Sequence, residues 1–590
     1  MNYDLINFPT VLPVDLDLYF REQLVYFFIN LNKNTTVYND LYEHLYSVLK
    51  LLKQTLQNDN KNTNYRKYLE LFYRMIGHTR YEKGEHDVSY MLLLTFYDVF
   101  PTLAIYALHR FVQPINGESC NDKPYNSFYG SCTAKPYHSF YGSCTDKPYH
   151  SLYGSCIANP YGSWRDMKHL CHYIYIQTGS QKHALIDTCI QLMNRQLAHD
   201  LESWKYSHYH SREHISNVAK WIPREHKKFD WLYERLVIDW AKTHYPFILR
   251  TVHDYDSYGQ AILKCKRLYR KTISMLNKGL DTTEIKLCSR KIDNITYVSK
   301  YTLMKQPKLN YREHVDQGHG YDIGHVLDQG QRVGHGHDFT LHYFVNEAIK
   351  LLDHPHDYRH DILNNQWTRF SKSYKKCIFE NMIPLLDMSF SNQLNNTESF
   401  YNAIGLAILI AEHSSFKCRI MAVDHQPTWI NWYSDIGFIS IVENIINVSG
   451  ATSFRLDKAI DIIVYSANVC EYSTQNMSLV LLSNQDFRSS YDMIISKFDK
   501  GLKSIILWKL SNDVENMNND NCFNSYIDIQ GLILLSGFSN CLHNYFKIIQ
   551  GLDHTNSDNN LYITPYNTIC QILENPKYNV LGDYLCKLIQ

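Results

Sequence analysis

The strongest constraint on the fold is a change in hydrophobic pattern near residue 375. Before it, apolar residues such as Leu24, Phe27 and Leu31 recur at helical spacing, and the alternation typical of strands is nearly absent. After it, short apolar runs alternate with helical patterns, which is typical of a doubly wound, mostly parallel sheet. We therefore predict a multidomain α then α/β chain, with a helical domain over residues 1–370 and a sheet domain over 375–590.

Helical patterns follow one another through the N-terminal part, with short proline or polar breaks. They cover most of 15–111, and further helices are predicted at 163–177, 181–201, 212–220, 229–243, 257–280 and 340–352. Serial helices without strands favour stacked helical pairs, an α-solenoid of the HEAT-like kind. Trp221 and Trp367 lie in this part, and we expect both in its core.

Two segments interrupt the helical pattern. A repeat insert at 120–163 holds copies of a twelve-residue unit that begin at Cys120, Cys132, Cys144 and, truncated, at Cys156. A Gly/His-rich loop at 315–338 contains His-Gly-His at 335–337. We favour surface loops for both over the alternatives, a Tyr/Cys-rich binding loop and a transition-metal site.

The C-terminal part is predicted to contain five strands, at 378–386, 418–423, 479–482, 504–508 and 529–536. Helices are expected between them at 399–413, 436–448, 456–468 and 491–498, and again after the last strand. In an open parallel sheet the ligand crevice lies beyond the carboxyl ends of the strands. Residues that directly follow a strand are therefore the first candidates for a site.

The charge and cysteine content narrow the class of protein. Lys plus Arg equals Asp plus Glu at 59 each, so no global field draws the chain to nucleic acid or to an anionic membrane. The 15 Cys show no paired spacing and the first residues lack a secretory pattern, so we expect an intracellular, cytoplasmic protein. The longest apolar run, at 403–411, is far too short for a membrane helix.

A candidate metal site follows the first predicted strand. Asp387, Ser389 and Ser391 form the pattern D-x-S-x-S, and Thr452 lies in a later loop that would reach the same edge of the sheet. These hard oxygen ligands suit Mg²⁺, which keeps several waters and leaves room for an oxygen from a partner. The alternative is that Asp387 and the two serines only make local turn hydrogen bonds.

The helix predicted at 257–280 is rich in cations, namely Lys264, Lys266, Arg267, Arg270, Lys271 and Lys278. Four of them (264, 267, 271 and 278) fall on one helical face, with Tyr269 nearby. Cations that meet phosphates and a ring that stacks on a base are ingredients of RNA binding. A solvated basic face is the plainer interpretation of the same pattern.

Residues 375–590 resemble a von Willebrand factor A domain, whose metal site uses D-x-S-x-S, a Thr loop and an acidic loop after a middle strand. The whole chain resembles an uncharacterised family found in plants, fungi and giant DNA viruses, which pairs a helical N-terminal region with such a domain. The matching pieces are LDLYF at 16–20, YGSWRD at 161–166, AKWIPR at 219–224, TEIKL at 283–287, QW at 366–367, ILW at 506–508 and LSGFS at 535–539. Two departures concern the metal site: Asn484 stands where the family has a carboxylate, and Phe390 where it has glycine.

The resemblance implies a non-enzymatic binding or scaffold protein that meets a protein partner through Mg²⁺ at the Asp387–Ser391 loop, in a host cytoplasm or a virion if the chain is viral. The layout of helices followed by an A-type domain is also similar to that of the Ro ribonucleoprotein, which makes RNA binding the first alternative. A hydrolase or nuclease is the second, although no zinc-protease, phosphate-loop or nucleophile-elbow motif occurs.

Overall fold

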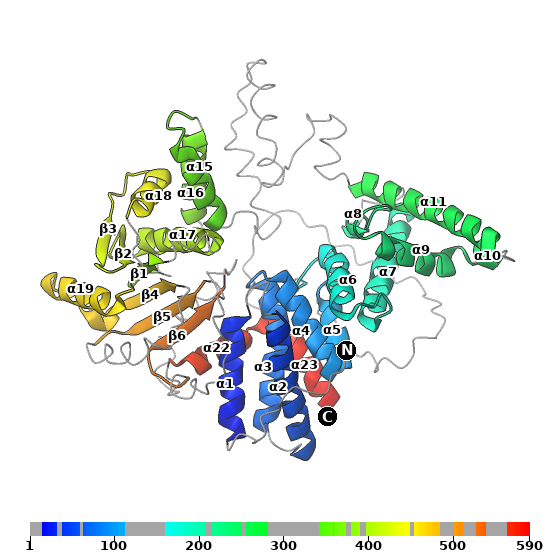
Figure 1. Cartoon of the computed structure of the whole chain (residues 1–590), viewed down its shortest axis with the longest axis horizontal. Helices are drawn as coiled ribbons and strands as arrows, with labels where there is room; N and C mark the ends of the chain where they lie inside the picture. Colours follow the sequence, from blue (N-terminus) through cyan, green and yellow to red (C-terminus); the bar gives the residue numbers. More distant parts are fainter. Residues whose placement is uncertain are drawn as a thin grey trace.

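The structure is a computed structural model that describes residues 15–31, 38–59, 63–112, 160–206, 215–250, 255–280, 341–357, 359–372, 374, 379–389, 397–448, 454–483, 501–510, 527–537 and 563–589. Its elements form a helical part and a part built around one sheet (Figure 1). The Gly/His-rich loop at 315–338 lies outside the described residues. So does the repeat insert, apart from residues 160–163.

The described N-terminal part is helical, as the sequence predicts. Its first group is α1 (Leu16–Asn30), α2 (Tyr38–Asn58), α3 (Thr63–Tyr81), α4 (His86–Val99) and α5 (Pro101–Arg110). Its second is α6 (Trp164–Thr178), α7 (Ala184–Tyr206), α8 (Val218–Trp221), α9 (Asp230–His244), α10 (Pro246–Arg250) and α11 (Tyr255–Leu280). Contacts between α4 and α6 join the two groups. Among the described helices, none is both long and apolar enough to cross a membrane.

Local signals set several of the helix ends. The Asp15 carboxylate caps α1 by accepting hydrogen bonds from the backbone N–H groups of Asp17 and Leu18, at 2.9 and 3.1 Å. Pro101 occupies the first turn of α5, where its missing N–H has no intrahelical partner to lose. The last turn of α6 closes on Gly179, whose φ of 66° is the left-handed conformation that glycine adopts without strain.

The sheet has six strands in the order β3-β2-β1-β4-β5-β6. They are β1 (Met382–Asp387), β2 (Arg419–Val423), β3 (Thr428–Asn431), β4 (Ser478–Ser483), β5 (Ser504–Lys509) and β6 (Leu532–Ser536). All neighbouring pairs are parallel except β2 and β3, which are antiparallel. The five predicted strands are confirmed. The short edge strand β3 was not predicted, because its four residues include polar ends and no apolar run.

Some helices pack directly on the sheet, and others pack on those helices. α17 (Thr397–His413) packs on β1, β2 and β4, and α19 (Leu456–Val469) contacts β2. α15 (Leu341–Leu352), α16 (Arg359–Lys372) and α18 (Phe438–Ile446) pack together beside α17. α15 approaches α17 so closely at Gly405 that an added Cβ would lie 2.9 Å from the Cβ of Leu341. Trp367 of α16 is buried and stacks on Phe438 with ring centroids 4.0 Å apart, as a core residue should.

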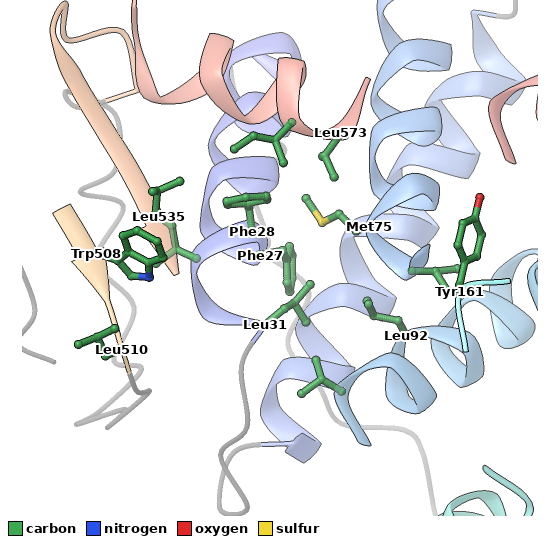
Figure 2. Close-up of a cluster of buried hydrophobic side chains, with 14 of the residues drawn as sticks. Phe27, Phe28, Leu31, Met75, Leu92, Tyr161, Trp508, Leu510, Leu535 and Leu573 are labelled. Carbon is green, nitrogen blue, oxygen red and sulfur yellow. The ribbon is translucent and has the colours of Figure 1, made fainter. Parts of the chain in front are cut away.

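The C-terminal helices α22 (Pro565–Leu573) and α23 (Asn579–Ile589) pack against the first helical group, mainly α1 and α3. Two 3₁₀ turns, at Thr474–Asn476 and Pro576–Tyr578, complete the described elements. Figure 2 shows the shared core, in which Leu573 lies near Phe28 and Met75, while Trp508 and Leu535 come from the sheet. Apolar residues of the two predicted parts therefore pack in one core, and the domain boundary near residue 370 stays a prediction.

Candidate cation-binding site at the carboxyl edge of the sheet

The strand order creates a switch point at the end of β1. From β1 the chain goes to β2 on one side, and later returns to β4 on the other side. In a parallel sheet of this order, a ligand crevice is expected at the carboxyl ends of β1 and β4, where the connections lead to opposite sides. β1 lies between β2 and β4 (Figure 1), and Asp387 is its last residue.

Asp387 is fully buried and holds two serine hydroxyls. Its Oδ1 atom accepts hydrogen bonds from the backbone N–H of Ser389 at 2.9 Å and from the Ser389 hydroxyl at 2.6 Å. Its Oδ2 atom accepts one from the hydroxyl of Ser483, the last residue of β4. The carboxylate thus ties the first loop to the strand on the far side of the switch point.

These hydrogen bonds fix how the hydroxyls can act. A serine hydroxyl has one proton and two lone pairs, and both Ser389 and Ser483 direct the proton at Asp387. Any further contact of either oxygen must then be made as an acceptor or as a metal ligand. Toward a cation, both hydroxyls and the carboxylate can act only through oxygen lone pairs, which is the kind of ligand that Mg²⁺ takes.

A second carboxylate, Asp424, directly follows β2 and was missed in the sequence analysis. The N–H of Met388 donates to the Val423 carbonyl at 3.1 Å, which holds the two strand ends together. Burial raises the pKa of Asp387, the hydrogen bonds from Ser389 and Ser483 oppose the rise, and the charge of Asp424 adds to it. An acid directly after a strand beside β1 was the signal that could have found it.

The predicted metal ligands are only partly described. Asp387 and Ser389 lie together, whereas Ser391 and Thr452, like the departures Phe390 and Asn484, fall outside the described residues. Within the described ranges, no three His, Cys, Asp or Glu side chains form a group that could hold a metal. The possible metal ligands that are described, two carboxylates and two hydroxyls, are all hard oxygens, the type of ligand that Mg²⁺ prefers.

The predicted RNA-binding cations on α11 divide into two sets. Lys264, Arg267, Lys271 and Lys278 are exposed along the helix. Lys266 is nearly buried and pairs with Glu234 at 2.8 Å and with Glu225 at 3.4 Å. Arg270 pairs with the same Glu225 at 3.1 Å.

The expected stacking role of Tyr269 is wrong. The ring is fully buried against Trp240, with centroids 5.5 Å apart, and its hydroxyl donates to Asn194 at 2.8 Å. Tyr269 faces inward because it follows the apolar stripe of α11, which packs on α7 and α9. No face of this ring is available to a base.

Comparison with known proteins identifies no relative: no family model, no curated protein and no solved structure matches this chain.

Proposed function

We propose that this chain is a non-enzymatic binding or scaffold protein that captures a protein partner through Mg²⁺ at the carboxyl edge of its sheet. The observation that carries the proposal is the placement of Asp387, buried at the switch point with two serine hydroxyls aimed at it. Ser391 and Thr452 are proposed as the remaining protein ligands. The setting is proposed to be intracellular.

The electrostatics of the crevice support cation binding. Asp387 and Asp424 repel each other, and burial already disfavours the charge on Asp387. A bound divalent cation would supply the positive charge that makes two neighbouring carboxylates favourable. Since only ionised Asp387 is a good ligand, we expect affinity for Mg²⁺ to fall as the pH drops through its raised pKa.

The partner is proposed to contribute an acidic side chain. Mg²⁺ demands six ligands and is seldom enclosed by protein alone, so a position remains for an outside oxygen. The von Willebrand A-like assignment is part of the same proposal, supported by the mostly parallel sheet and the aspartate at the end of β1. A HEAT-like helical part is proposed as well, supported by the pairwise contacts of α6 with α7 and of α9 with α11.

The proposal is tested by thermal unfolding of the full chain with and without Mg²⁺. Specific binding to the folded state at about one hundred times the dissociation constant stabilises it by about 2.7 kcal/mol, so the midpoint must rise. We expect the rise to vanish in Asp387→Asn and to persist in Glu443→Gln, which removes an exposed carboxylate from α18. Equal shifts in all three proteins would indicate non-specific binding and would refute the proposal.

RNA binding by α11 is the second candidate. The observation in its favour is the exposure of four cations of α11, Lys264, Arg267, Lys271 and Lys278. No described carboxylate forms an ion pair with any of these four side chains. Against it stand the ion pairs of Lys266 and Arg270 and the burial of Tyr269. The crevice is therefore the better supported of the two sites.

A further inference from the structure

A second basic surface, distinct from α11, surrounds two aromatic rings in the second helical group. We call it the Trp221 patch and define it as Arg165 and Lys168 of α6, Lys220 and Trp221 of α8, and Lys228 and Phe229 before α9. Trp221 was expected in the core, but it is only half-buried. It is the last residue of α8, a single short turn that contacts α6, α7 and α11.

Cations approach both rings of the Trp221 patch. The side-chain nitrogen of Lys168 lies 5.3 Å from the ring centroid of Trp221 and 5.0 Å from that of Phe229, so it bridges the two rings. The guanidinium of Arg165 lies 5.7 Å from Trp221, and Lys228 lies 5.6 Å from Phe229. All these distances are within the range of cation–π attraction.

Acidic residues do not balance these charges. No carboxylate of the described residues forms an ion pair with Arg165, Lys168 or Lys228. Three acids are close in sequence. Glu225 is engaged by Lys266 and Arg270, Asp230 accepts a hydrogen bond from the N–H of His226 at 3.0 Å, and buried Asp166 is held by Arg80 and His86.

Burial is the main cause of the lowered pKa values of Lys168 and of the nearby His169 and His172, and the neighbouring cations add to it. Burial and the charge of Arg165 lower the pKa of Lys168. Burial, Lys168 and Arg165 lower the pKa of His169 to about 4, and burial and Lys228 lower that of His172. Arg165 and Lys168 also lie in the first turns of α6, where the helix dipole is positive. A bound anion would reduce the repulsion among these positive charges.

We propose that the Trp221 patch binds single-stranded nucleic acid, with phosphates on Arg165, Lys168, Lys220 and Lys228 and one base stacked against each of Trp221 and Phe229. Half-buried rings keep part of their surface accessible, and stacking is sequence-tolerant because every base has a flat face. An acidic peptide would satisfy the cations but would not use two adjacent rings. This site shares no residue with the cation crevice, so it stands or falls independently of it.

The test is fluorescence anisotropy of the full chain with a labelled twelve-nucleotide oligouridylate at several salt concentrations. Stacking contributes about 1–3 kcal/mol per base, so Trp221→Leu and Phe229→Leu should each weaken binding about 5- to 150-fold. Tyr258→Leu, which removes an exposed aromatic ring of α11, should leave affinity unchanged. A double variant, Lys168→Gln with Lys228→Gln, should weaken binding and flatten its salt dependence while leaving both rings in place.

Three outcomes would overturn the proposal. Equal competition by inorganic polyphosphate of similar charge would make the patch a general anion site. Loss of binding in Lys264→Gln with Lys271→Gln, but not in Lys168→Gln with Lys228→Gln, would place the nucleic acid on α11. The third is a full chain that does not bind the oligonucleotide at low salt. Circular dichroism of each variant separates a lost site from a lost fold.

Discussion

Asp166 is a buried carboxylate on which four residues of the helical part converge. It accepts two hydrogen bonds from the guanidinium of Arg80 at 2.9 and 2.8 Å, one from Tyr90 at 2.7 Å and one from the N–H of Ser163 at 2.7 Å. It also lies 2.8 Å from the Nδ1 atom of His86. Burial would raise the pKa of Asp166, but the hydrogen bond from His86 and the charge of Arg80 hold it well below its usual range.

Asp166→Asn should therefore be strongly destabilising. The change leaves the largely buried guanidinium of Arg80 without its counter-charge, a loss of about 3–5 kcal/mol in the free energy of unfolding. Urea unfolding followed by circular dichroism measures it. Asp87→Asn, an exposed acid in the first turn of α4, is the matched control and should cost less than about 1 kcal/mol.

The depressed pKa of Asp166 also predicts how the difference in free energy of unfolding between wild type and Asp166→Asn changes with pH. Because the folded-state pKa of Asp166 is depressed, its contribution is complete above the unfolded value of about 3.9 and is lost as the pH falls below it. The gap between wild type and Asp166→Asn should then be constant from pH 7 to about pH 5 and should narrow in stronger acid. A gap that widens in acid would contradict this assignment.

At the scale of single residues, the sequence identifies positions better than partners. Asp387 and Ser389 were found because they follow a strong strand pattern, and the structure brings them together. Asp424 was missed because its importance depends on which strand lies beside β1. Tyr269 was misjudged for a similar reason: proximity to lysines in sequence does not reveal which face of α11 is buried.

Among the elements, the C-terminal helices and α1 connect the two parts of the chain. The guanidinium of Arg74 in α3 donates to the carbonyl of Leu573 at 3.2 Å, and Tyr578 is fully buried. Lys83, buried after α3, donates to the hydroxyl of Ser536 at the end of β6 at 2.8 Å and also to the Phe28 carbonyl in α1. Burial lowers the pKa of Lys83 to about 7.

This packing predicts that the chain stays together when it is cut between its two parts. We would insert a protease site between residues 372 and 374, purify the folded protein and cleave it. The fragments should co-elute in gel filtration and separate only in denaturant, because α22 and α23 remain on α1 and α3, and α16 remains on α18. Separate elution of two folded fragments would contradict the shared core and would support independent domains.

The elements themselves were largely predictable, whereas their packing was not. Periodicity located the helices near 163–177, 229–243 and 257–280 and the strands β1, β2, β4, β5 and β6. It did not reveal that α15 and α16, which precede residue 375, pack on the helices of the sheet. Nor did it place α22 and α23 on α1 and α3, because contacts across hundreds of residues leave no local pattern.

On the scale of the whole molecule, two candidate binding surfaces lie on different parts of the chain. The oxygen-rich end of β1 belongs to the sheet, while the Trp221 patch belongs to the second helical group (Figure 1). The balanced overall charge of the chain concealed both surfaces, because it averages an acidic edge with a basic face. Local charge, and not the total, determines what each surface can bind.

The most direct test of a cation site at the end of β1 is to count the Mn²⁺ ions that bind to the full chain by electron paramagnetic resonance. Mn²⁺ takes the oxygen ligands of Mg²⁺, and competition by Mg²⁺ separates such a site from imidazole-rich segments such as 315–338. We expect one bound Mn²⁺ that Mg²⁺ displaces and that is absent in Asp387→Asn. No Mg²⁺-sensitive Mn²⁺, or the same bound fraction in Asp387→Asn, would contradict a cation site at the end of β1.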